Sequence, residues 1–351
     1  MKEKMPVLEK KRLGFFDIAK GIGILLVITA HIEYVDPGIR NYIVSFHMPL
    51  FFVVSGMLAC VTNETKRDVK TVVVKKMKRI MLPYLIFSVL FPVIDIIYFY
   101  ITGNGDPFGC LPQNVYDTAV LYGNSVLWFL PTAFFGDILF FITMKAAMKI
   151  SERYSAFITV MITLAAACTA CILFGHTNDH LVVAFVRFFP AAFFVSAGNL
   201  LYSLFAGIKP GRVILAAAGA ALLVILVFIH GFNGIVDMHF GVYGNPALYF
   251  VNALIGSMGV IFISMASDTG RSFPVIRFYG RNSLFVMITH INFYILYCSE
   301  VLSFKFTEYI PRAKNIVFNL MTVLFVLAAE FVLIKAYEIG KILVAAKKIK
   351  D

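Results

Sequence analysis

Long apolar stretches separated by short polar segments recur along the whole chain. Each stretch holds about 18 or more mostly apolar residues, the length that an α-helix needs to cross a bilayer. The pattern predicts an all-α, polytopic membrane protein with about ten transmembrane helices. We expect these helices at residues 15–33, 43–61, 80–100, 126–145, 157–175, 181–205, 213–230, 247–267, 280–298 and 314–338.

The composition agrees with this pattern. Of the 351 residues, 60% are hydrophobic and only 15% are charged, whereas roughly a quarter of the residues in a soluble globular chain are charged. No charged block is long enough to form a separate domain. We therefore expect residues 1–351 to form a single transmembrane domain, with short basic ends at 1–13 and 340–351.

The net charge of +11 is unevenly distributed between the connecting segments. Basic residues concentrate in the N-terminal segment, in the even-numbered loops and in the C-terminal tail, while the third, fifth and seventh loops contain no Lys or Arg. The positive-inside rule then predicts that both termini lie in the cytoplasm. This charge pattern indicates loop bias and contact with membrane lipids rather than with nucleic acid. We expect a multi-pass protein of a cell membrane, taken as the bacterial cytoplasmic membrane.

Two histidines stand out within the apolar stretches. His31 lies near the end of the first stretch and His47 just inside the start of the second, with a short polar loop at 33–41 between them. If both stretches cross the membrane, the two imidazoles lie at a similar depth on the outer side. An ionisable residue inside a span is by default a functional hypothesis, and imidazole suits proton transfer near neutral pH.

The first stretch carries polar residues along one helical face. Asp17, Lys20, Gly21 and His31 are spaced so that they lie roughly on the same side of a helix. Asp17 and Lys20 are close enough to pair at the cytoplasmic end, although both are also typical of an ordinary membrane interface. His31 follows fourteen residues later, about 21 Å along the axis.

Several segments then resemble a known family. The opening segment, Arg12-Leu-Gly-Phe-Phe-Asp17 and onward to His31, resembles the first motif of the acyltransferase 3 family of integral membrane O-acyltransferases. The segment from Phe46 through His47 to Gly56 resembles the second motif of its fucose 4-O-acetylase-like branch. Residues 76–84, 128–131 and 280–290 are similar to later landmarks, so the resemblance covers essentially the whole chain.

The resemblance implies a ten-helix fold that moves an acetyl group from cytoplasmic acetyl-CoA to a hydroxyl of an extracytoplasmic carbohydrate or glycan. Acetyl-CoA is then a donor substrate, with no permanently bound cofactor. His31 is the family's key histidine, as general base or acyl carrier. His47 would orient His31, stabilise charge or take the catalytic role itself. Asp17 belongs to the opening motif and is a third candidate catalytic residue. Whether the acyl group is acetyl or succinyl stays open, as does the choice between direct transfer and an acyl-enzyme.

Donor binding is expected on the cytoplasmic side. The family often carries an Arg-x-x-Arg pair that meets the CoA phosphates, and here the two positions are Lys76 and Arg79. Lysine keeps the charge but loses the bidentate fork of arginine. Arg12 and Arg281 are further candidates for the donor site.

The remaining polar residues inside the spans are weaker candidates. Arg187, Trp128 and His290 are possible substrate contacts or sources of charge stabilisation. Intramembrane acids are expected to pair within the bundle, namely Asp95, Asp137 and Glu330. No metal site is predicted, because His230, Asp237 and His239 lack a defined ligand geometry. The alternative function is a proton-coupled secondary transporter or exporter of a sugar-like solute, since intramembrane His, Asp and Arg also serve proton relays.

Overall fold

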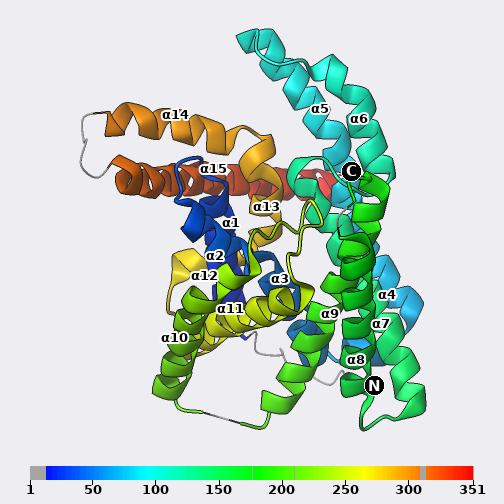
Figure 1. The fold of residues 1–351 in the computed structure, drawn as a ribbon. Helices are drawn as coiled ribbons and strands as arrows, with labels where there is room; N and C mark the ends of the chain where they lie inside the picture. Colours follow the sequence, from blue (N-terminus) through cyan, green and yellow to red (C-terminus); the bar gives the residue numbers. More distant parts are fainter. Residues whose placement is uncertain (1–12, 176, 209, 309–313, 351) are drawn as a thin grey trace.

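The computed structural model describes residues 13–175, 177–208, 210–308 and 314–350, and these are almost entirely helical (Figure 1). Within them the only β-pairing is an isolated bridge between Asp237 and Val242. The long helices are α1 (Phe15–His31), α3 (His47–Val61), α5 (Leu82–Thr102), α7 (Phe129–Ile150), α8 (Ser155–Phe174), α9 (His180–Phe205), α10 (Arg212–Ile229), α11 (Pro246–Ser267) and α15 (Lys314–Lys350). The shorter ones are α2 (Pro37–Val44), α4 (Val69–Lys76), α6 (Pro107–Ala119), α12 (Pro274–Arg281), α13 (Ser283–Asn292) and α14 (Ile295–Thr307). Four further short helices are η1 (Glu64–Lys66), η2 (Met77–Met81), η3 (Ser125–Trp128) and η4 (His230–Asn233).

The predicted membrane character is confirmed. The described residues contain 8 helical segments long and apolar enough to cross a membrane, or up to 9 if the bent pair α13–α14 forms one span. Helix α1, with 17 residues, is just shorter than the 18 that this count requires. Ten crossings and a cytoplasmic location of both termini stay predictions.

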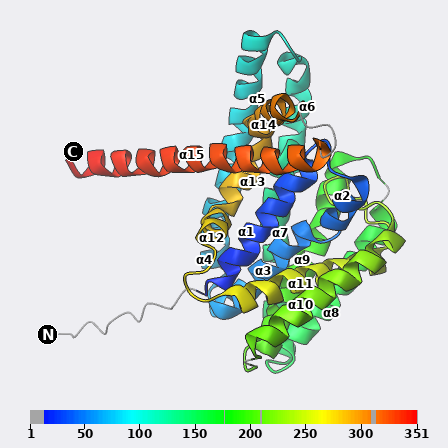
Figure 2. The same cartoon turned by 90° about the vertical axis from the view of Figure 1, so that its left-hand side faces the viewer.

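The helices differ in how much they face their surroundings. Helices α3 and α9 are mostly buried, whereas most residues of α5, α10 and α15 are partly or fully exposed. The hairpin of α5 and α6 projects beyond the other helices, and α15 runs across α1 (Figures 1 and 2). Large exposed apolar side chains on peripheral helices are typical of surfaces that face lipid.

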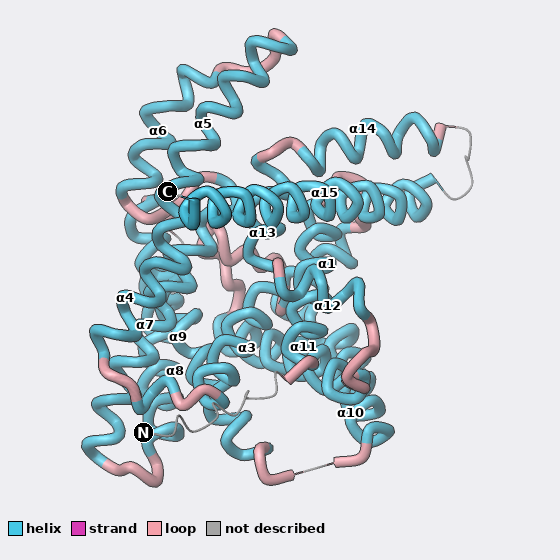
Figure 3. Tube along the Cα trace, turned by 180° about the vertical axis from the view of Figure 1, so that it is seen from behind, coloured by secondary structure: helices cyan, strands magenta, loops and turns pink. Residues whose placement is uncertain are grey.

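Two polar segments predicted as loops contain helices. Helix α2 lies in the segment after His31, and α6 occupies much of the predicted loop at 101–124 (Figure 3). Both begin with an Asp-Pro pair, in which the Asp36 or Asp106 carboxylate accepts backbone N–H groups of the first turn. Asp at the N-cap followed by Pro is a recognised helix start, so the sequence did carry this signal.

The stretch predicted as one helix at 280–298 is broken. Helices α13 and α14 meet at an angle of 67°, and Tyr294 at the junction has a left-handed backbone with a φ of 57°. The Tyr294 hydroxyl donates a 3.0 Å hydrogen bond to Asp95, and its ring stacks on Tyr98 of α5 with centroids 4.1 Å apart. These contacts come from a helix about 200 positions away in the sequence, which local periodicity does not reveal.

Helix α1 packs closely against α12 because glycines remove side chains from the contact. A Cβ atom on Gly280 would overlap the backbone oxygen of Asp17, and one on Gly21 would overlap that of Ile276. Small residues allow such close helix approach in membrane proteins. The contact brings Arg281, the last residue of α12, beside the first turns of α1.

Candidate active site

Two cavities are built around α1 and share three helices. The histidine cavity, about 400 Å³, is lined by residues that include His31, His47, Arg40, Trp128, Asp237 and His239. The basic cavity, about 300 Å³, is lined by residues that include Lys20, Lys75, Lys76, Arg79 and Arg281. Lys20 lies about 16 Å before His31 along α1 at 1.5 Å per residue.

The cavities approach each other within one helical turn. On α3, Met48 lines the histidine cavity and Phe51 lines the basic cavity. On α13, Met287 lines the histidine cavity and Leu284 lines the basic cavity. The phenyl rings of Phe51 and Phe129, with centroids 5.9 Å apart, line the basic cavity, and Phe51 follows Met48 of the histidine cavity by one turn of α3. An aromatic contact of this kind excludes water while leaving only a few side chains between the two cavities.

His31 and His47 both line the histidine cavity and hold the same ring nitrogen against the backbone. Nδ1 of His31 lies 2.8 Å from the carbonyl oxygen of Val27, and Nδ1 of His47 lies 3.1 Å from that of Ile43. A carbonyl oxygen only accepts, so Nδ1 carries the proton in both rings. In the neutral imidazole Nε2 then keeps its lone pair, as a general base or nucleophile requires. The structure therefore brings together the two histidines that the sequence singled out.

His290 lies behind His31 rather than in the cavity wall. The two ring centroids are 5.2 Å apart in an edge-on arrangement, and His290 is fully buried. Its Nδ1 lies 2.9 Å from the carbonyl oxygen of Val286, so it has the same tautomer as His31. Its Nε2 has no hydrogen-bond partner among the described residues. This proximity makes His290 a residue that supports His31.

The loop between α10 and α11 adds an acid and a further histidine that sequence reasoning did not place here. The Asp237 carboxylate accepts the backbone N–H groups of His239 at 2.8 Å and Phe240 at 3.4 Å. Burial raises the pKa of Asp237, against the opposing effects of these hydrogen bonds and of nearby His31. Burial and then the charge of Arg187 lower the pKa of His239 to about 3. His239 is therefore neutral at pH 7.

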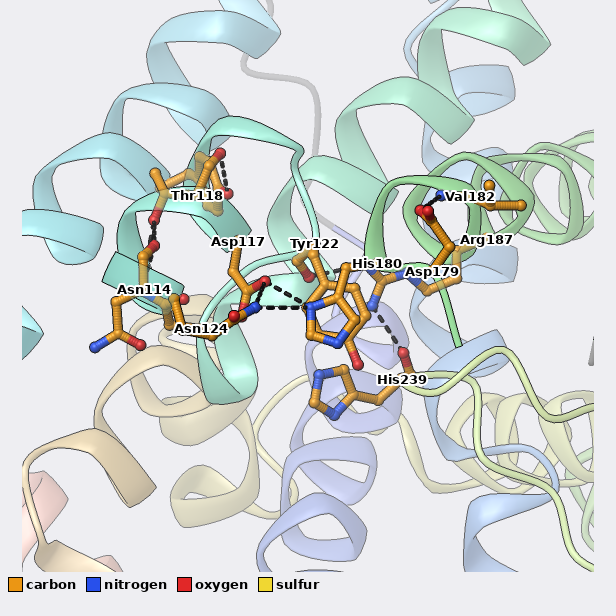
Figure 4. A network of polar contacts seen from close by, with 12 residues as sticks. Asn114, Asp117, Thr118, Tyr122, Asn124, Asp179, His180, Val182, Arg187 and His239 are labelled. Atoms are coloured by element: carbon orange, nitrogen blue, oxygen red, sulfur yellow. Dashed lines mark hydrogen bonds and ion pairs between the residues drawn. The ribbon is translucent and has the colours of Figure 1, made fainter. Parts of the chain in front are cut away.

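Arg187 lies outside both cavity linings, although the sequence suggested it as a possible substrate contact. Its side chain is fully buried and does not line either cavity. The guanidinium donates to the backbone oxygen of His239 at 3.0 Å and to that of Tyr122 at 2.8 Å. It also lies over the rings of Tyr122 and Trp128. Arg187 therefore holds two loops against α9, which makes it a positioning residue (Figure 4).

Lys76 is engaged in an ion-pair network. Its Nζ lies 2.7 Å from Asp137 Oδ2 and 3.1 Å from Glu64 Oε2, and Ser55 donates a 2.9 Å hydrogen bond to Asp137 Oδ1. Two carboxylates thus compete with any phosphate for this ammonium group. The structure favours a structural role for Lys76 over the predicted contact with CoA.

Arg79 is the better placed residue of the predicted pair. It is exposed, lines the basic cavity and lies in η2, a π-helical turn that interrupts the helix between α4 and α5. Such π-turns occur frequently at functional sites, because they change the direction of a few side chains within a helix. Lys75 is also exposed at this cavity, so Lys75 and Arg79 offer cations to an anionic donor.

Asp17 lies at the basic cavity end of α1, far from the catalytic position predicted for it. It is buried, and its carboxylate is 3.2 Å from Arg281 Nε and 3.5 Å from Lys20 Nζ. Because about 21 Å of helix separates Asp17 from His31, it does not contact the imidazole. We interpret Asp17 as the residue that positions Lys20 and Arg281. Arg12, the other predicted donor residue, lies outside the described residues.

His230, Asp237 and His239 do not come together around one point. Asp237 and His239 line the histidine cavity, but Nδ1 of His230 contacts the carbonyl oxygens of Leu226 and Val227, 3.0 Å from each. Within the described ranges, no group of three or more His, Cys, Asp or Glu residues is arranged to hold a metal ion.

The comparisons with known proteins decide the family. A family model described as an acyltransferase domain matches residues 13–335. The chain belongs to the acyltransferase 3 family. The match includes every helix that lines the two cavities, and it supports membrane acyltransferase activity over the transporter alternative. It does not distinguish the fucose 4-O-acetylase-like branch. No curated protein and no solved structure shows a significant match to the chain.

Proposed function

We propose that this acyltransferase 3 protein moves an acetyl group from cytoplasmic acetyl-CoA to a hydroxyl of an extracytoplasmic carbohydrate or glycan. The observation that carries the proposal is the pairing of the two cavities along α1. One offers the lone pair of His31 Nε2 and the other offers exposed cations, with one helical turn of α3 between their linings.

The basic cavity is the proposed donor site. The phosphates of CoA would contact Lys75, Arg79 and Arg281, since charge-assisted hydrogen bonds from such cations are the strong ones. The positive-inside pattern assigns this cavity to the cytoplasm, where acetyl-CoA is available. The narrow pantetheine arm would then carry the thioester past the aromatic contact of Phe51 and Phe129 toward His31.

In the direct route, His31 acts as general base. Nε2 takes the proton of the acceptor hydroxyl while the oxygen attacks the thioester carbonyl, so that the C–O bond forms and the C–S bond breaks. The imidazolium then returns its proton to the CoA thiolate. Asp237 is the nearby acid that would stabilise the imidazolium through its charge, since the two groups interact electrostatically, while the Nδ1 proton is held by the Val27 carbonyl oxygen. In the acyl-carrier route, Nε2 itself attacks the thioester carbonyl, so that the N–C bond forms and the C–S bond to CoA breaks. The acceptor hydroxyl then attacks the acetyl-imidazole, which forms the C–O bond, breaks the N–C bond and releases a proton that balances the one taken up by the CoA thiolate.

The test uses purified protein in nanodiscs with acetyl-CoA labelled in the acetyl group. We expect wild type to release CoA and to transfer label to a sugar acceptor. His31→Ala should lose at least about 10²-fold in rate, the usual contribution of a general base, while it still binds acetyl-CoA. His230→Ala is the matched control, because His230 is a histidine that lines neither cavity.

The direct route and the acyl-carrier route predict different labelling of the protein. Label retained on wild-type protein without acceptor, and absent from His31→Ala, supports the acyl-carrier route. An unlabelled but active protein supports the direct route. Retention of full transfer by His31→Ala would refute the role of His31, and absence of acetyl-CoA binding would refute the donor assignment.

A further inference from the structure

A third cavity, about 300 Å³, lies beside the histidine cavity and shares part of its lining. Ser125, His239 and Phe240 line both. The walls of this third cavity come from α5, α6, the start of α9, the segment before η3 and the end of α13. We call it the acidic cavity, because its charged lining residues are Asp95 and Asp117. A ligand bound in the acidic cavity would lie directly beside the histidine cavity, which His31 lines.

Polar side chains of the acidic cavity are held by hydrogen bonds to one another. The Asp117 carboxylate lies 2.6 Å from His180 Nδ1 (Figure 4), and it accepts a 2.8 Å hydrogen bond from Gln113. Asp95 accepts a 3.0 Å hydrogen bond from the Tyr294 hydroxyl. Each carboxylate is thus fixed in place through one oxygen, while its second oxygen has capacity to accept from a ligand.

Three buried polar atoms around the acidic cavity lack a partner. Asn124 Oδ1, Asn292 Nδ2 and His239 Nε2 are inaccessible to solvent and have no hydrogen-bond partner among the described residues. A buried polar atom left unpaired costs about 1–3 kcal/mol, and native proteins satisfy nearly all of them. Both donor and acceptor atoms occur in this set. Rotation of these side chains toward the cavity would let them pair with a ligand that carries several hydroxyl groups, since each hydroxyl both donates and accepts.

The aromatic part of the acidic cavity wall is the His180 ring. One face of this ring stacks on Tyr122, with centroids 3.9 Å apart and an interplanar angle of 10°, which leaves its outer face for a ligand. Arg187 fixes Tyr122 from behind through its backbone oxygen and its ring. A rigid aromatic face beside hydrogen-bonding groups is suited to a ligand with both an apolar face and polar edges, which is the character of a sugar ring.

The charge of the lining selects among sugars. Two aspartates line the acidic cavity, and no Lys or Arg is among its described lining residues. A carboxylate on the ligand would meet two like charges with no cation to pair with, and such juxtaposition is strongly unfavourable at a partly buried site. Uronic acids and other acidic sugars are therefore poor ligands for this cavity.

We propose that the acidic cavity binds an uncharged sugar unit of the acceptor and presents its hydroxyl to the histidine cavity across Ser125 and His239. This inference rests on the proposed acyl transfer, and it adds the chemical class of the acceptor and its binding residues. Asp95, Asn124 and Asn292 would hydrogen-bond the sugar hydroxyls, and the outer face of the His180 ring, which Tyr122 supports from behind, would contact the sugar ring.

The experiment measures binding of methyl glycosides to the protein in nanodiscs by saturation-transfer NMR, in the His31→Ala background so that no turnover intervenes. The probes are methyl β-D-glucoside, methyl β-D-galactoside and methyl α-L-fucoside, with methyl β-D-glucuronide as the acidic counterpart of the glucoside. The variants are Asn292→Leu, which removes an unpaired donor, and Asp95→Asn, which removes one charge with little change of shape. Asp106→Asn is the matched control, because Asp106 is an exposed acid outside the cavity.

We expect at least one neutral probe to bind, and the glucuronide to bind at least about tenfold more weakly than the glucoside, as like-charge contact predicts. Asn292→Leu should weaken neutral binding by about tenfold, the size of one lost buried hydrogen bond. Asp95→Asn should narrow the gap between glucoside and glucuronide, and Asp106→Asn should change neither. Equal or tighter binding of the glucuronide would overturn the proposal, as would a failure of all neutral probes to bind.

The outcomes separate this inference from the function on which it rests. If sugars bind through Asp95 and Asn292 but wild type transfers no acetyl group to them, the proposed function fails and the cavity assignment stands. If transfer to sugars depends on His31 but is unaffected by Asp95→Asn and Asn292→Leu, the acidic cavity is not the acceptor site.

Discussion

Replacing Lys76 by methionine tests whether this residue binds the donor or supports the fold. Its ammonium lies 2.7 Å from Asp137 and 3.1 Å from Glu64. At an effective dielectric constant of about 20, these distances correspond to attractions of about 6 and about 5 kcal/mol. Desolvation of the three charges offsets much of this sum. Removing one partner nevertheless leaves the other charges uncompensated, which costs about 3–5 kcal/mol. We expect a destabilisation of that size for Lys76→Met.

The assay compares thermal unfolding in detergent with the KM for acetyl-CoA. Lys75→Met is the matched control for the unfolding measurement, because Lys75 lines the same cavity but is exposed. Lys76→Met should lower the melting temperature much more than Lys75→Met does. Adding Asp137→Asn to Lys76→Met should recover part of the loss, since it removes one of the stranded carboxylates. If Lys76→Met unfolds like wild type but raises the KM for acetyl-CoA, Lys76 binds phosphate and our interpretation is wrong.

Three further predictions follow from single sites. Arg79→Ala should raise the KM for acetyl-CoA about tenfold or more, because one charge-assisted hydrogen bond is lost. The melting temperature of this variant should stay unchanged, because Arg79 is exposed. Gly280→Val should lower the melting temperature, because its side chain would overlap the Asp17 backbone oxygen and overpacking typically costs about 1–3 kcal/mol; an unchanged melting temperature would contradict the close α1–α12 contact. The pKa of His239 is about 3 when buried, against 6.5 when exposed, so protonation favours opening of its loop. The stabilisation from neutral His239 is present above about pH 6.5, and about 2 kcal/mol of it is lost on going from pH 7 to pH 5. Hydrogen exchange at the Val242 amide should report this loss of stability in wild type but not in His239→Gln. Both proteins contain Asp237, so the comparison also controls for its raised pKa, which has the opposite effect on stability.

Local patterns were sufficient to predict much of the architecture. Membrane-spanning helices must satisfy their backbone internally and cover themselves with apolar side chains, so each one is visible as a run of residues. The same locality explains why His31 and His47 could be singled out. They flank one short connection, so the chain itself keeps them close and brings both to one cavity.

Contacts between distant segments were beyond the reach of these patterns. His290 lies against His31, and the acids at 64 and 137 meet Lys76, although nothing in the intervening sequence encodes either distance. Asp237 was visible only as an acid in a loop, because its neighbours are set by how that loop folds over the helix ends.

The sequence by itself determined the membrane-spanning helical class, the family motifs and the two histidines at the helix ends. Only the tertiary structure decided which cations are exposed to a donor, which acids are already paired, and where an acceptor sugar would lie. The reason is physical. Burial of apolar residues is recorded position by position along the chain, whereas pairing of charges and formation of cavities depend on which helices pack together.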